Sequence, residues 1–146
     1  MLILIDFDGT VVTHEYPVVG KDIGAVPVLK KLLAAGHQFI LYTMRSYMEG
    51  ISPVTNKLQD GGLNDAVKWF ADNEIPLYGI NENPSQSVWT SSPKPYAQLM
   101  IDDSALGCPL VFDMNISSRP FVNWDIVEQM LIQMNVILIE DGTNNG

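Results

Sequence analysis

The sequence predicts an α/β fold: a three-layer α/β/α sandwich around a mostly parallel, doubly wound sheet. Short apolar runs alternate with amphipathic helix-like segments, and this alternation is typical of parallel sheets with crossover helices. The chain has 146 residues, of which 47% are hydrophobic, and this is enough for one hydrophobic core. We therefore expect a single domain over residues 1–139, followed by a flexible C-terminal tail over residues 140–146.

Short apolar runs bounded by polar or turn-forming residues predict the strands. The first run is continuously apolar and ends in an acidic segment, which is typical of a buried strand in a parallel sheet. The expected strands span residues 2–7, 38–43, 75–80, 97–101, 109–112 and 136–139.

Apolar residues at helical spacing predict three helices between these strands. The first helix has Pro27 in its first turn and ends before Gly36, a common distribution of these two residues. The second helix carries Leu63 and Phe70 on its apolar face. The third spans residues 123–134, with Asn123 as its N-terminal cap.

Three stretches rich in proline, glycine or serine predict irregular structure. Residues 11–22 are expected to form a loop or a small flap. Residues 44–62 and 84–95 are expected to form further loops. Because the expected helices and strands fill the rest of the chain, these three stretches are the candidates for substrate recognition.

Composition excludes several classes of protein. Eight Lys and Arg residues face seventeen Asp and Glu residues, which gives a formal net charge of −9 and argues against general binding of nucleic acid or anionic membranes. The lone Cys108 excludes an internal disulfide or a cysteine-based zinc site. No apolar run is long enough to span a membrane, and we expect a cytoplasmic protein.

Polar residues follow several of the expected strands. Asp6 and Asp8 follow the first strand, Thr43 ends the second, and Asp102 and Asp103 follow the fourth. Because ligands of such sheets bind beyond the carboxyl ends of the strands, these residues are expected to share one site. Four carboxylates would repel one another strongly without a cation, and oxygen ligands of this kind favour Mg²⁺.

The pair Asp6 and Asp8 suits divided chemistry, in which one carboxylate attacks as a nucleophile and the other transfers a proton. Gly9 permits a tight turn with room for a bound group, and the Thr10 hydroxyl can hydrogen-bond the loop. Both residues are expected to bind the substrate. Arg45 lies two residues after Thr43. Its side chain is expected either to contact a substrate phosphate or to be solvated.

Four motifs in order along residues 1–115 resemble those of the haloacid dehalogenase (HAD) superfamily. The segment Asp-Phe-Asp-Gly-Thr over residues 6–10 is similar to the first motif, and Thr43 matches the Ser/Thr of the second. Lys94 matches the basic residue of the third motif, and the adjacent Asp102 and Asp103 match the acidic fourth.

The resemblance implies a role for each of these residues. Asp6 would be the nucleophile that forms an aspartyl-phosphate, and Asp8 would be the general acid and then the base that activates water. Mg²⁺ would be held by Asp6, the main-chain carbonyl of Asp8, and Asp102, with Asp103 binding it directly or through water. The resemblance also implies that Thr43 would hydrogen-bond a phosphoryl oxygen and that Lys94 would neutralise charge near the nucleophile.

Within the superfamily that the chain resembles, an acid at position 8 implies phosphatase or phosphomutase chemistry. Expected helices and strands fill the intervals between the motifs, which leaves no room for a full cap domain. The resemblance therefore implies a small capless Mg²⁺-dependent phosphatase acting on a phosphorylated metabolite, with nucleic acid disfavoured. An open site also suits a substrate enclosed by a second copy of the chain, in a homo-oligomer. The alternative function is a catalytically weak or silent domain of the same fold that binds a phospholigand or a partner.

Overall fold

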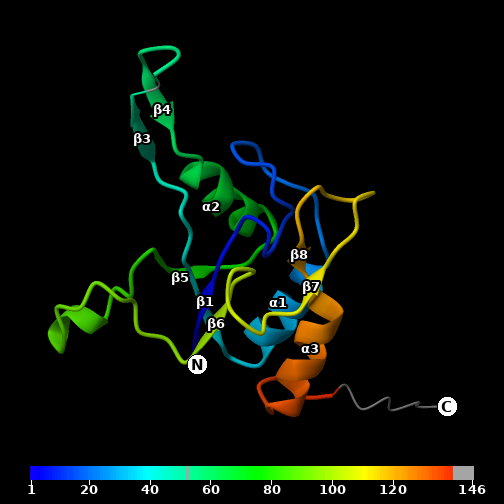
Figure 1. The fold of residues 1–146 in the computed structure, drawn as a ribbon. Helices are drawn as coiled ribbons and strands as arrows, with labels where there is room; N and C mark the ends of the chain where they lie inside the picture. Colours follow the sequence, from blue (N-terminus) through cyan, green and yellow to red (C-terminus); the bar gives the residue numbers. More distant parts are fainter. Residues whose placement is uncertain (52, 140–146) are drawn as a thin grey trace.

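A parallel sheet forms the centre of the molecule. The computed structural model describes residues 1–51 and 53–139. The sheet contains β1 (Leu2–Ile5), β2 (Gln38–Leu41), β5 (Leu77–Ile80) and β6 (Leu99–Ile101), in the order β5-β2-β1-β6 (Figure 1). All three pairings between neighbouring strands are parallel. The α/β class and the parallel sheet expected from the sequence are thus confirmed.

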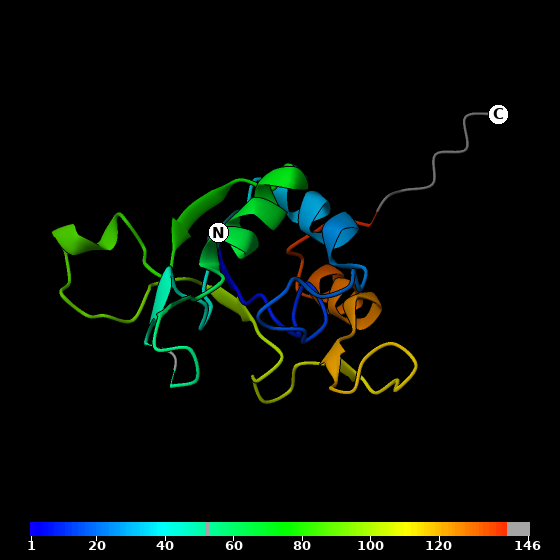
Figure 2. The ribbon, with the colours of Figure 1, turned by 90° about the horizontal axis from the view of Figure 1, so that it is seen from above.

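The helices are α1 (Ala25–Ala34), α2 (Leu63–Asp72) and α3 (Trp124–Gln133). Their buried side chains share one core with Ile3 and Ile5 of β1 and with Phe39 of β2. Because side chains alternate along a strand, these residues lie on one face of the sheet. Figure 2 shows the three helices on the same side of the sheet, so the layer over the opposite face is thinner.

Two small antiparallel sheets lie outside the central one. β3 (Met48–Ile51) pairs with β4 (Leu58–Asp60), and β7 (Leu110–Val111) pairs with β8 (Phe121–Val122). The stretch over residues 44–62, expected to be irregular, therefore contains a hairpin. The strand expected over residues 109–112 exists in part, but it pairs with β8 and does not extend the central sheet.

The strand expected over residues 136–139 is not formed. Asn135 has a positive φ of 56°, and the amides of Val136 and Ile137 both donate to the carbonyl of Leu131. The chain therefore folds back on the end of α3, where the side chains of Val136 and Ile137 are buried in the core. The expected tail over residues 140–146 lies outside the described residues.

The helix ends agree closely with the sequence expectations. The α1 helix begins at Ala25, which leaves Pro27 in its first turn, and Gly24 precedes it with a φ of 90°. The Asn123 side chain caps α3, as predicted, by accepting a hydrogen bond from the amide of Ile126. Among the described residues, the structure has no helix with the length and apolar character that crossing a membrane requires.

The carboxyl ends of the parallel strands gather the irregular segments at one edge. The segment after β1 and the β3–β4 hairpin both rise from this edge (Figure 1). The segment that carries the 3₁₀ helix η1 (Gln86–Val88) instead projects sideways, away from the hairpin (Figure 1). The segment after β1 and the residues that lead into the hairpin contribute to the candidate site, whereas the segment that carries η1 does not.

Candidate functional site

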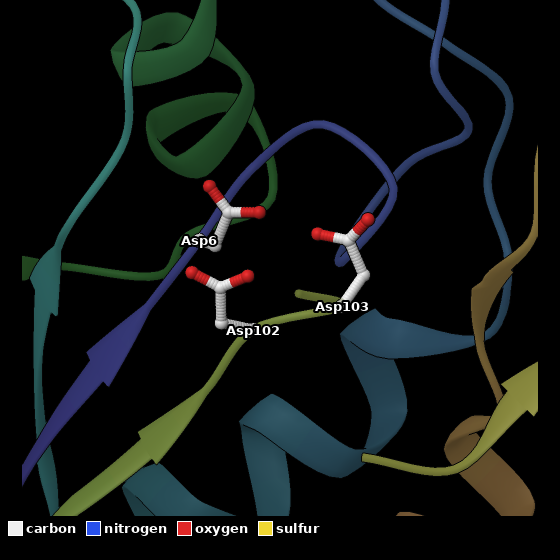
Figure 3. A group of neighbouring side chains, drawn as sticks. All are labelled: Asp6, Asp102 and Asp103. Atoms are coloured by element: carbon white, nitrogen blue, oxygen red, sulfur yellow. The ribbon is translucent and has the colours of Figure 1, made fainter. Parts of the chain in front are cut away.

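Three carboxylates converge at the carboxyl ends of β1 and β6. The parallel register pairs Ile5 with Ile101, so the next residues, Asp6 and Asp102, leave neighbouring strands side by side. Asp103 follows directly, and Figure 3 shows the three carboxyl groups facing a common space. One oxygen from each of Asp6, Asp102 and Asp103 lies within 4.8 Å of the others.

The buried side chain of Thr10 organises two of these carboxylates. Its Oγ1 donates to Oδ2 of Asp6 at 2.8 Å and lies 3.3 Å from Oδ1 of Asp103. The same hydroxyl accepts a hydrogen bond from the amide of Asp103 at 3.1 Å. The indole of Trp124 donates to the carbonyl of Thr10, which ties the loop to α3. Thr10 therefore fixes the separation of Asp6 and Asp103.

The electrostatics of this cluster favour a bound cation. Burial and the neighbouring Asp102 carboxylate raise the pKa of Asp6 to about 8. Both effects disfavour the ionised form, and a divalent cation would reverse both. Clustered carboxylate oxygens suit a hard cation such as Mg²⁺ or Ca²⁺. The donor set thus fits a divalent metal without identifying it.

Asp8 lies outside this cluster and forms an ion pair with Arg45. The Nε and Nη2 atoms of Arg45 donate to the two carboxylate oxygens of Asp8, each at 2.8 Å. The resemblance assigned the metal to the main-chain carbonyl of Asp8, not to its side chain. The carboxylate is therefore free of the metal cluster, and Arg45 fixes its orientation.

Arg45 is buried, with 2% of its surface exposed. Besides the pair with Asp8, its Nη1 donates to the carbonyls of Pro17 and Gly62, and its Nη2 donates to the carbonyl of Val18. A guanidinium has five N–H groups, and these contacts use all five. Arg45 is therefore neither solvated nor free to bind a substrate phosphate, in contrast to both expectations.

Thr43 lies at the site as expected. Its amide donates to Oδ1 of Asn81 at 2.8 Å, and its hydroxyl oxygen accepts from the amide of Arg45 at 3.1 Å. The hydroxyl proton remains available to a group in the cavity. Asn81 holds this segment from the end of β5.

Lys94 is not brought to the site. Its side chain is exposed in the segment between β5 and β6, and it does not line the cavity that contains Asp6. The Gln86 side chain holds this segment by donating to the carbonyls of Ser92 and Lys94 and by accepting from the amide of Tyr96. The segment therefore closes on itself instead of folding over the carboxylates.

A cavity of about 360 Å³ opens beside the cluster. The expected residues that line it are Asp6, Asp8, Thr43, Arg45, Asp102 and Asp103. It is also lined by residues that the sequence analysis did not assign to the site: His14, Tyr16, Met44, Ser104 and Arg119. Met44 and Ser104 directly follow the predicted site residues Thr43 and Asp103, so adjacency in the sequence could have indicated them. No local pattern marks His14, Tyr16 and Arg119, because long-range folding of loops places them there.

Gly9 and Thr10 support the site from behind and do not line the cavity. Gly9 has a φ of 77°, and a Cβ at this position would lie 2.0 Å from Nε2 of His14. The absence of a side chain thus lets His14 approach closely and place its Nε2 2.8 Å from Oδ2 of Asp103. The expected contact of Gly9 and Thr10 with substrate is replaced by this supporting role.

Comparison with known proteins supports the fold. A solved structure of a conserved protein coded by a locus of Bacteroides thetaiotaomicron is 28% identical to this chain, with a TM-score of 0.66. The match covers 92% of this chain and 91% of the other. The fold is shared. No protein-family model matches the chain, and no curated protein sequence matches it.

Proposed function

We propose that this protein is a Mg²⁺-dependent phosphomonoester hydrolase of the HAD superfamily type, acting through an aspartyl-phosphate on Asp6. The observation that carries the proposal is the division of acidic groups at one cavity. Asp6 lies with Asp102 and Asp103, where a cation fits, whereas Asp8 opens onto the same cavity with its carboxylate held by Arg45. Two acids in different environments suit two different roles.

In the proposed reaction, a carboxylate oxygen of Asp6 attacks phosphorus and the bond to the leaving oxygen breaks. Asp8, which must be protonated for this step, gives its proton to that oxygen. Asp8 then takes a proton from water as the water attacks the aspartyl-phosphate, which releases inorganic phosphate and regenerates the Asp6 carboxylate. The proton that Asp8 donates in the first half of the reaction is recovered from water in the second half.

The remaining residues position these groups. Asp6, Asp102 and Asp103 would hold Mg²⁺, which supplies positive charge beside the phosphoryl group when bound. The free hydroxyl proton of Thr43 is available for a phosphoryl oxygen. Arg45 keeps the Asp8 carboxylate in one orientation through two hydrogen bonds, one to each carboxylate oxygen.

The test is hydrolysis of p-nitrophenyl phosphate by the full chain. We expect turnover with Mg²⁺, loss of turnover in EDTA, and a decrease of at least about 1,000-fold in kcat for Asp6→Asn, since the nucleophile is removed. Asp72→Asn is the matched control, because Asp72 lies on the exposed face of α2 and pairs with Lys68. Unchanged turnover of Asp6→Asn would refute the proposal.

The second candidate is a phospholigand-binding domain that keeps the metal cluster without useful catalysis. It is favoured by the Asp8–Arg45 pair, which commits both oxygens of the proposed acid to protein contacts. Binding of inorganic phosphate in the presence of Mg²⁺, without turnover of any of a panel of phosphate esters, would support this candidate.

The substrate class we propose is a small phosphorylated metabolite in the cytoplasm. A cavity of about 360 Å³ is in the range of small-molecule sites, and the net charge of −9 disfavours a long polyanion. A second copy of the chain could enclose the open side of the cavity, and the oligomeric state measured with and without substrate tests this.

A further inference from the structure

The proposed reaction requires a cationic side chain for the substrate phosphate, and the structure removes the two residues first considered for it. Lys94 lies outside the cavity, and Arg45 has all five N–H groups bound to protein oxygens. Phosphate binding needs donors that face the ligand, so neither side chain can supply it in this structure.

Besides Arg45, Arg119 is the one Arg or Lys residue among the described residues that line the cavity. It is exposed, and its guanidinium makes no hydrogen bond or ion pair with the residues that the structure describes. Its N–H groups are therefore available to a ligand. A planar guanidinium with free donors matches the geometry of a phosphate group.

The segment that carries Arg119 is held in place from two sides. The amide of Arg119 donates to Oγ of the buried Ser117 at 3.3 Å, and the amide of Ser117 donates to the carbonyl of Asp113. Lys21 reaches across from the segment after β1, where its Nζ donates to the carbonyl of Ile116 at 2.6 Å. The backbone beside Arg119 is thus anchored, while its side chain is left unpaired at the cavity.

The charges around the cavity point the same way. The charges of Asp8 and Arg45 compensate each other. The three other carboxylates of the cavity, those of the metal cluster, would keep a net negative charge even with one divalent cation bound. The positive charge of Arg119 offsets that negative charge where a phosphate must enter.

Building on the proposed function, we propose that Arg119 binds a phosphate group of the substrate, the role that sequence order assigned to Lys94. This group is either the one that is hydrolysed or a second phosphate on the same substrate. The shared chemistry is a bidentate contact between guanidinium and phosphate oxygens.

The test measures binding of inorganic phosphate by ³¹P NMR titration in Mg²⁺, together with kinetics on p-nitrophenyl phosphate. For Arg119→Ala we expect Kd for phosphate and KM for the ester to rise roughly 10-fold or more, as for loss of a charged hydrogen bond, with partial recovery in Arg119→Lys. A change confined to a substrate with two phosphates, such as a sugar bisphosphate, would place Arg119 at the second phosphate and also support the proposal.

Lys68→Ala removes the same charge from α2, away from the cavity, and should change none of these values. If Lys94→Ala weakens phosphate binding and Arg119→Ala changes neither the single-phosphate nor the bisphosphate substrate, the proposal is overturned. Because phosphate binding is read without turnover, failure of the hydrolase proposal leaves this result interpretable. Normal hydrolysis with unchanged phosphate binding in Arg119→Ala would refute the proposed role of Arg119 and leave the hydrolase proposal standing.

Discussion

Asp6 is the residue whose ionisation the fold opposes most clearly. Its pKa rises to about 8 because the carboxyl is buried and lies beside Asp102. The nucleophile of the proposed reaction must be ionised, and in the metal-free protein it is largely protonated at neutral pH. Metal binding would therefore release a proton and at the same time prepare the carboxylate for attack.

The raised pKa of Asp6 predicts how the metal-free stability depends on pH. Between about pH 4 and pH 8 the folded state retains a proton that the unfolded state, with an ordinary pKa of 3.8, has lost. The contribution of Asp6 to the free energy of unfolding should therefore fall as pH rises through this window. Urea unfolding in EDTA at pH 5 to 8 measures it.

The comparison variant is Asp6→Asn, which cannot titrate at this position. We expect its stability to depend less steeply on pH than that of the wild type, and the two curves to diverge as pH rises. Parallel curves would contradict the assigned pKa shift. Titration of other groups is common to both proteins and cancels in the difference.

Individual site residues were predictable where strand ends dictate position. Asp6, Asp102 and Asp103 follow adjacent parallel strands, and that topology alone brings them together. Lys94 was assigned by motif order, which carries no information on distance. Arg45 was visible as a candidate, but its partners Asp8, Pro17 and Gly62 are remote in sequence, so its contacts were not predictable.

At the scale of elements, the amphipathic patterns located all three α-helices but missed the β3–β4 hairpin. Every residue of β4 is exposed, so no alternation of apolar and polar residues marks it. The two-residue strands β7 and β8 are too short for any periodicity. The helices bury one face along ten residues each and leave a pattern in the sequence, whereas an exposed strand such as β4 and a two-residue strand such as the buried β8 do not.

The N-terminal cap of α3 supports a stability prediction. Oδ1 of Asn123 accepts a hydrogen bond from the amide of Ile126 at 3.2 Å. Asn123→Ala leaves that amide without its side-chain partner and should lower the free energy of unfolding by about 1 kcal/mol. Asn123→Ser should retain most of the stability. Urea denaturation monitored by circular dichroism measures both, and equal losses would contradict the capping role.

At the scale of the whole molecule, the alternating pattern predicted the parallel sheet. It also led us to expect helices on both faces of that sheet, whereas the α-helices of the described residues all lie on one face. The chain moves from β1 to β2 to β5 in one direction across the sheet. Right-handed crossovers then place α1 and α2 on the same face. Strand order is decided by long-range packing, and the sequence pattern alone does not specify it.

The five contacts of Arg45 have a further consequence for the motions of the molecule. Its guanidinium joins the segment after β1, through Pro17 and Val18, to Gly62 at the start of α2. Neither segment can move away without breaking contacts that also hold Asp8. We therefore expect the two segments to open as one cooperative unit, although Val18 and Gly62 are 44 positions apart in the sequence.

Native-state hydrogen exchange tests this expectation. The amide of Thr13 donates to Lys21 within the first segment, and the amide of Leu63 donates to Ser46 beside the second. Both should show the same opening free energy and the same dependence on urea concentration, because one event exposes both. Different urea slopes would show independent opening. A shared slope would mean that the buried guanidinium of Arg45 determines how often this side of the cavity is exposed to water.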